Sequence, residues 1–158
     1  MAMSGRAQPP SAPVAGMSSQ VILGIDPGQH TGIAVFTGGK LETLHTISPH
    51  QIADFLRSSG AGRVIFEDSR LTSFMFTTVK SRPAALKMAR NVGTVDAWCA
   101  LIVAVCSDLG ITAHGVSPKG KGAKLDAKAF ARMTGWLAAS NEHCRDAAMV
   151  AWPYRSAK

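Results

Sequence analysis

Two apolar runs in the first half of the chain each end in an acidic residue. Residues 21–25 lead into Asp26, and residues 64–66 lead into Glu67. Uninterrupted apolar runs bounded by turn residues are typical of central strands that are covered on both faces. A carboxylate at the end of such a strand loses part of its hydration, and two carboxylates brought together repel each other unless a cation neutralises them. The chain is therefore expected to fold around a sheet whose strand ends concentrate negative charge.

A third acidic segment lies near the C-terminus, where residues 142–150 are predicted to form a helix. Positions three or four apart share a helix face, so Asp146 converges with either His143 or Glu142, and the spacing does not choose between them. The helix dipole favours acids in the first turn and accounts for Glu142. It does not account for Asp146 within an apolar stretch. Two strand-end carboxylates facing this helix predict a divalent-metal site, with metal-assisted phosphodiester chemistry as its leading use.

The strand-end carboxylates also have plainer explanations. Asp26 precedes Pro27-Gly28, and an Asp before Pro-Gly commonly forms a turn. Glu67 and Asp68 are equally compatible with a solvated strand exit. Glu67 is the better ligand candidate because it directly follows the apolar run, whereas Asp68 would point to the opposite face if the strand continued.

The chain is strongly basic, with a net charge of +7 over 158 residues, which is the length of one domain. A basic surface around an acidic pocket is typical of nucleases, although a merely solubilising surface would also explain the charge. Two aromatic residues in a basic segment can stack on unpaired bases, or fold onto the core instead. The candidate DNA-binding residues are Arg70, Phe74, Phe76, Lys80, Arg82, Lys119, Lys121 and Lys124.

Residues 1–19 are proline-rich and are predicted to be a disordered leader, with residues 20–158 forming the folded domain. The leader lacks the continuous apolar stretch of a secretory signal, and the apolar runs are too short to cross a bilayer. We therefore expect a cytoplasmic protein, in a bacterial host cell, with no membrane partner. Cys99, Cys106 and Cys144 form no CxxC pair and are expected to be reduced thiols.

The order of predicted elements is three strands, a helix, a strand, a long helix, a strand and two helices. The predicted strands are residues 20–26, 31–36, 41–47, 64–67 and 111–116, and the predicted helices are residues 50–58, 81–108, 126–135 and 140–152, the last capped by Ser140 or Asn141. Residues 69–80 are predicted to be a mobile loop. The long helix is apolar on two sides, so it is either central to the core or buries one side against another subunit.

With these residues in place, the chain resembles the RuvC-type Holliday-junction resolvases of the ribonuclease H-like superfamily, and among them the short members carried by phages and prophages. The resemblance covers roughly residues 20–152. Its matching segments, in family order, are residues 24–28 with Thr31-Gly32, residues 65–70, residues 124–130 with 134–136, and residues 142–148.

The resemblance implies an α/β fold with a ribonuclease H-like mixed sheet of about five strands flanked by helices. It implies a homodimer that resolves four-way or otherwise branched DNA by paired nicks, leaving 5′-phosphate ends, with two Mg²⁺ or Mn²⁺ ions per subunit and no small-molecule cofactor. It assigns catalysis and metal ligation to Asp26, Glu67, His143 and Asp146, and so favours His143 over Glu142. Many relatives carry Asp at the position of His143.

The chain also departs from the family pattern. Arg70 stands where several bacterial relatives place an aromatic residue that probes the junction, and Phe74 or Phe76 is the candidate substitute. Two other functions remain open. A YqgF-like RNA-processing nuclease would share the fold and act on RNA, and a non-catalytic module would bind branched DNA without cutting it.

Overall fold

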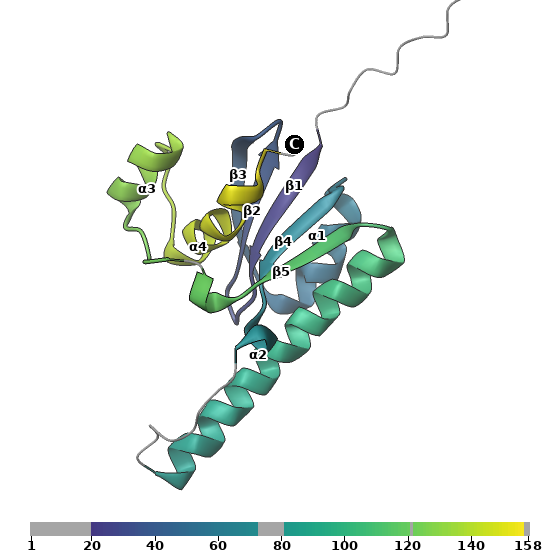
Figure 1. Cartoon of the computed structure of the whole chain (residues 1–158), viewed down its shortest axis with the longest axis vertical. Coiled ribbons are helices and arrows are strands. Elements are labelled where there is room, and N and C mark those ends of the chain that lie inside the picture. Colours follow the sequence, from purple (N-terminus) through teal and green to yellow (C-terminus); the bar gives the residue numbers. More distant parts are fainter. Residues whose placement is uncertain (1–19, 73–80, 121, 157–158) are drawn as a thin grey trace, which may run out of the picture.

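The computed structural model describes residues 20–72, 81–120 and 122–156 of the chain. Within these ranges the core is one mixed sheet of five strands in the order β3-β2-β1-β4-β5 (Figure 1). The strands are β1 Val21–Asp26, β2 Thr31–Thr37, β3 Lys40–Ile47, β4 Arg63–Glu67 and β5 Thr112–Val116. The β1–β2 and β2–β3 pairs are antiparallel, whereas β4 pairs parallel with both β1 and β5. The predicted fold class, an α/β mixed sheet flanked by helices, is confirmed.

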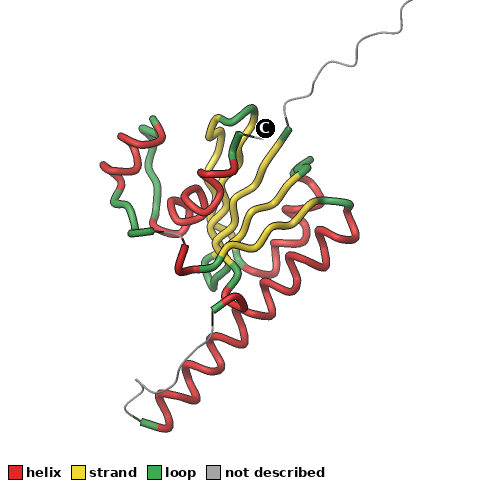
Figure 2. Tube along the Cα trace, viewed as in Figure 1, coloured by secondary structure: helices red, strands yellow, loops and turns green. Residues whose placement is uncertain are grey.

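Helices cover both faces of the sheet, as Figure 2 shows. The helices are α1 Ile52–Ser58, α2 Arg82–Leu109, α3 Ala127–Thr134 and α4 Glu142–Ala151. Side chains alternate along a strand, so each central strand supplies two separate cores. Leu23 and Ile25 of β1 pack with the buried residues of α1 and α2, whereas Ile22 packs with α4 and with Phe130 of α3. We call these two sides the α2 face and the α4 face of the sheet.

The helix boundaries follow the predicted capping residues. The side chains of Ser81, Asp126 and Asn141 accept hydrogen bonds from the backbone N–H groups of Ala84, Ala129 and Cys144, respectively. Asn141, rather than Ser140, is therefore the cap of α4. Gly110 and Gly135 end their helices with φ of 68° and 76°, the left-handed conformation that favours glycine.

Two predictions about secondary structure need correction. Residues 69–71, predicted as part of a loop, form a short 3-10 turn, Ser69–Leu71, which Asp68 caps through the backbone N–H of Arg70. The helix predicted to begin at residue 50 instead begins at Ile52, after a 3-10 turn over Pro49–Gln51. The three cysteines are free and buried, as expected for reduced thiols, and burial raises the pKa of the Cys106 thiol to about 11.

The long helix α2 is buried along one half and exposed along the other. Its buried residues, Cys99, Ile102, Val105 and Cys106, all lie in the C-terminal half. The N-terminal half extends past the edge of the sheet (Figure 1). The sequence predicted that this helix is either central to the core or buries one side against another subunit; its C-terminal half packs on the core, and the subunit contact stays a prediction.

By length and composition, α2 is also the one helix among the described residues that is apolar enough to cross a membrane. Its most apolar window has a mean hydropathy of 1.6 and is 22% buried. The sequence had suggested that no apolar run was long enough for this. A helix that packs on the core of a soluble protein passes the same test, and one such helix is weak evidence for a membrane span.

The α4 helix lies unusually close to the sheet because two strand residues beneath it lack side chains. A Cβ atom at Gly24 would overlap the carbonyl oxygen of Ala147, and a Cβ atom at Gly32 would overlap that of His143. Both contacts are with helix backbone, which cannot swing aside. The two glycines therefore set the depth at which α4 packs.

We expect Gly24→Ala to lower the free energy of unfolding by about 1–3 kcal/mol, the usual cost of overpacking, because the added methyl group must displace α4. Gly93→Ala is the matched control, since nothing lies within 4 Å of a Cβ atom there. It sits inside α2 and should gain about 0.5–1 kcal/mol from helix propensity. Urea denaturation followed by circular dichroism measures both, and equal stabilities of the two variants would contradict this account of the packing.

Candidate metal centre

Asp26 and Glu67 lie side by side at one edge of the sheet. The parallel pairing of β1 with β4 places Ile25 opposite Phe66, so the acidic residues that follow occupy neighbouring positions, about 4.8 Å apart between strands. Ile25 and Phe66 belong to the core on the α2 face. The next residue of each strand must point the other way, so both carboxylates are directed toward the α4 face.

The N-terminal half of α4 covers this same edge. Gly32 is the register partner of Asp26 on β2, and the backbone of His143 rests directly against Gly32. Asp146 follows one turn later and is only 4% exposed. The four residues predicted as metal ligands therefore come from three elements to one edge of the sheet: Asp26 and Glu67 from the strand ends, and His143 and Asp146 from the N-terminal half of α4.

A lysine contributes positive charge at this edge. Lys124 Nζ lies 3.4 Å from Asp146 Oδ2 and 3.5 Å from Glu142 Oε2. The charge of Asp146 is the main cause of a raised pKa at Lys124, with Glu142 adding to it. Lys124 was predicted to contact DNA, and here its amine pairs with the buried carboxylate of one predicted ligand.

The ring of His143 lies toward the rim of the site. Its side chain is 35% exposed, with Nε2 3.9 Å from Glu142 Oε1 and the ring centroid 5.5 Å from that of His30. His30, in the turn between β1 and β2, was not among the predicted site residues. In the sequence, His30 could have been identified by its position four residues after Asp26, in the turn at the same sheet edge.

The donor types at this edge suit a hard divalent cation. Three carboxylates and one imidazole supply the oxygen-rich set that Mg²⁺ and Mn²⁺ accept. Among the described residues, no three His, Cys, Asp or Glu side chains converge closely enough to hold a metal ion. The predicted ligands thus have suitable chemistry and lie at the same end of the sheet, without converging into one metal-binding group.

Asp68 faces away from this site, as its place after Glu67 predicts. It is 5% exposed and is held by Arg70, whose Nε and Nη2 atoms each donate to it at 2.8 Å. The hydrogen bond from Arg70 is the main cause of a lowered pKa at Asp68. Its carboxylate also packs against the backbone of Gly115, where a Cβ atom would lie 2.8 Å from Oδ2. Arg70, a predicted DNA contact, is therefore engaged in fixing this turn.

The other predicted DNA contacts are spread over the chain. Lys119 is exposed on the 3-10 turn Pro118–Gly120 that follows β5. Arg82 is exposed at the first position of α2, at the end that protrudes from the domain (Figure 1). The remaining four lie outside the described residues: Phe74, Phe76, Lys80 and Lys121.

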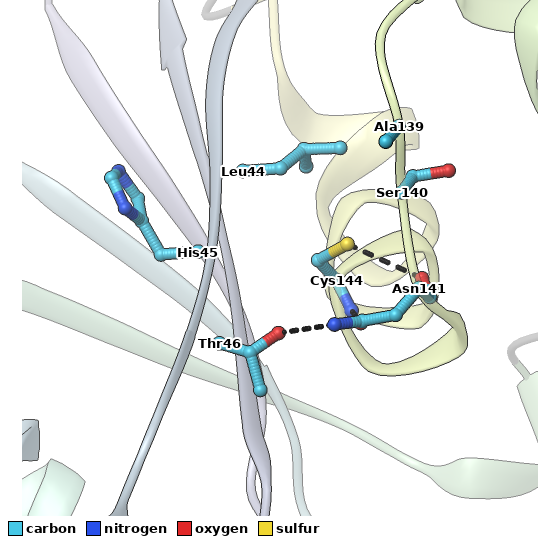
Figure 3. A pocket seen from close by; sticks show the side chains of 7 residues that line it. All are labelled: Leu44, His45, Thr46, Ala139, Ser140, Asn141 and Cys144. Atoms are coloured by element: carbon cyan, nitrogen blue, oxygen red, sulfur yellow. Dashed lines mark hydrogen bonds between the residues drawn. The ribbon is translucent and has the colours of Figure 1, made fainter.

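A surface pocket lies between β3 and the start of α4, apart from the predicted ligands (Figure 3). Asn141 crosses it, donating from Nδ2 to Thr46 Oγ1 at 2.8 Å while it caps α4. None of the four predicted ligands lines this pocket. It is formed by Leu44, His45, Thr46, Ala139, Ser140, Asn141 and Cys144.

Comparison with known proteins supports the fold. No protein-family model matches the sequence, and no curated protein matches it. Among solved structures, the chain is similar to T. thermophilus RuvC in complex with a Holliday junction substrate, with 18% sequence identity and a TM-score of 0.57. The match covers 84% of this chain and 90% of that one. It shows a RuvC-like fold.

The Asp68–Arg70 pair predicts how stability depends on pH. The pKa of Asp68 is lowered from 3.8, so the stabilisation is complete above that value and is lost as the pH falls through the folded-state pKa. Arg70→Leu should lower the free energy of unfolding at neutral pH by about 1–2 kcal/mol. This is less than for a fully buried pair, because solvent screens the Arg70 side chain, which is 38% exposed. This deficit relative to wild type should shrink as Asp68 becomes protonated.

Arg57→Leu is the matched control, because Arg57 pairs with Asp54 at 2.9 Å but both side chains are well exposed. It should change stability by less than about 0.5 kcal/mol. Urea titrations at a series of pH values measure both variants. A deficit for Arg70→Leu that stays constant down to the acid transition would rule out this role for the pair.

Proposed function

We propose that this protein is a divalent-metal-dependent endonuclease that nicks four-way or otherwise branched DNA as a homodimer. The single observation that carries the proposal is the placement of Asp26, Glu67 and Asp146 at one edge of the sheet. That edge belongs to a fold shared with a RuvC protein that was solved on a Holliday junction. Half-buried and buried carboxylates from separate elements are costly to bring together, and bound cations offset that cost.

Each residue has a separate part in this proposal. Asp26 and Glu67 hold metal from the strand ends, and His143 with Asp146 hold it from α4. Bound Mg²⁺ or Mn²⁺ supplies activation of water and stabilisation of the departing oxygen. Lys124 already compensates the charge of Asp146, and its loop also lets it offset charge on the scissile phosphate. The net charge of +7 supports attraction of a polyanion.

The homodimer is supported by an apolar row along α2. Positions spaced alternately by four and three residues lie on one side of a helix. The row comprises Met88, Val92, Val95, Cys99, Ile102 and Cys106. The sheet buries its last three members, whereas Met88 is 38% exposed and Val92 is half-buried on the protruding half of the helix. A second copy would cover this end of the row, and a two-fold dimer matches the symmetry of a four-way junction.

Asp26→Asn should retain junction binding and lose nicking by more than about a hundredfold, which exceeds the usual effect of removing a group that only hydrogen-bonds to a metal ligand. The neutral amide keeps the shape of the side chain but ligates a cation poorly. Asp54→Asn is the control, since Asp54 is exposed on α1, where its carboxylate pairs with the exposed Arg57. The assay is nicking of a labelled four-way junction in Mg²⁺ or Mn²⁺, with binding measured in the absence of metal.

The same assay separates the proposal from its alternatives. Labelled four-way junction, Y-fork, duplex and RNA hybrid are incubated in parallel with each metal. Preferential cleavage of the branched DNA supports the proposal. Preferential cleavage of RNA would favour an RNA-processing nuclease. Tight junction binding without metal-dependent nicking would favour a non-catalytic module, and nicking that survives Asp26→Asn would reject the site.

Val92→Glu should convert the dimer to a monomer, because a charge buried in an apolar interface costs several kcal/mol without a partner. Ala97→Glu, on the exposed side of the same helix, should leave the dimer intact. Size-exclusion chromatography with light scattering distinguishes the 16.6 kDa protomer from its dimer. A wild-type protein that elutes with the mass of one protomer would remove the dimer from the proposal.

A further inference from the structure

A set of contacts joins α2 to the residues at the end of β4, on the side of the sheet opposite the candidate metal centre. Ser69 Oγ donates to Asp96 Oδ1 at 2.6 Å, across 27 positions of sequence. Cys99, one turn after Asp96, places its Sγ 3.7 Å from the same hydroxyl. That sulfur also lies 3.6 Å from the backbone carbonyl oxygen of Glu67, to which it donates.

These contacts act on the backbone that carries Glu67. The carbonyl of Glu67 is held from α2 by Cys99, and the second residue after it is held by Asp96 through Ser69. Between them, the N–H of Asp68 donates to the carbonyl oxygen of Val116 at 2.9 Å, which fixes the chain to β5. The backbone on the C-terminal side of Glu67 is thus fixed, while its side chain points to the α4 face.

Asp96 is a notable residue to find in this part of α2. It lies between Val95, which packs on the core, and the buried Cys99, and it is itself half-buried. A carboxylate in such surroundings loses hydration, and its 2.6 Å bond with Ser69 compensates for part of that loss. An apolar residue at position 96 would be sufficient if α2 only had to pack on the sheet.

We propose that Ser69 and Asp96 are positioning residues that fix Glu67 for metal binding, acting from α2 through the turn after β4. This inference rests on the proposed function, because it assigns Glu67 the task of holding a metal ion. Groups that orient a ligand without touching the metal typically change metal affinity or activity by about 10–100-fold when they are removed. Neither residue touches substrate or metal in this proposal.

The test compares Asp96→Ala, Asp96→Asn and Ser69→Ala in the full-length protein. Asp96→Ala and Ser69→Ala should each weaken Mn²⁺ binding by about tenfold, measured by calorimetry or by the Mn²⁺ resonance signal without DNA. They should raise by a similar factor the Mn²⁺ concentration that gives half-maximal nicking. Asp96→Asn keeps an acceptor oxygen for Ser69 and should restore most of the affinity. Asp108→Ala, at an exposed site on the last turn of α2, is the control.

A merely structural tie between α2 and β4 would lower the melting temperature without moving Mn²⁺ affinity at temperatures where the variants are folded. That result overturns the inference and leaves the proposed function intact. If Asp96→Ala fails to fold, Ser69→Ala gives the same comparison, because it removes only a hydroxyl group. A wild-type protein that neither binds Mn²⁺ nor nicks branched DNA overturns the proposed function, and this inference with it.

Discussion

The close packing of α4 on the glycines of β1 and β2 is the constraint on which the candidate site depends. Gly24 and Gly32 let the helix backbone rest on the sheet at Ala147 and His143. Side chains at these positions would lift α4 and carry His143 and Asp146 away from the strand ends. The geometry of the site is therefore set by two glycines, which have no side chain that could bind metal or substrate. Asp26 lies beside this contact, because its register partner on β2 is Gly32, against which the backbone of His143 rests.

Asp68 and Asp146 are both buried acidic residues, but they form ion pairs of different kinds. Asp68 is buried on the α2 face and bound by the forked guanidinium of Arg70, which holds it as an ionised structural group. Asp146 is buried on the α4 face and pairs with Lys124, a flexible side chain that remains 66% exposed. A bidentate pair is difficult to open, whereas an exposed lysine exchanges readily. The chain thus places the exchangeable cation at the carboxylate proposed to bind metal.

Much of the fold could be predicted because its determinants are local. Apolar runs mark β1 and β4, and Ser81, Asp126, Gly110 and Gly135 bound their helices as side-chain capping and left-handed φ require. The shared edge of Asp26 and Glu67 followed from strand ends alone. The pairing of Lys124 with Asp146 and that of Ser69 with Asp96 could not be predicted in the same way. Each joins residues more than twenty positions apart, and only the packing of α2 and α4 on the sheet determines which side chains meet.

The helix α2 has two tasks that meet at Asp96. On its C-terminal side, buried residues anchor the helix to the sheet; on its N-terminal side, the same apolar row continues past the domain. Asp96 and Cys99 lie where one half gives way to the other, and they are the residues that contact the turn after Glu67. A subunit docked on the protruding half would restrain the helix just before this point. In the proposed dimer, the helix that presents its apolar row to a partner would also position Glu67, so assembly and ligand geometry would be linked through one element.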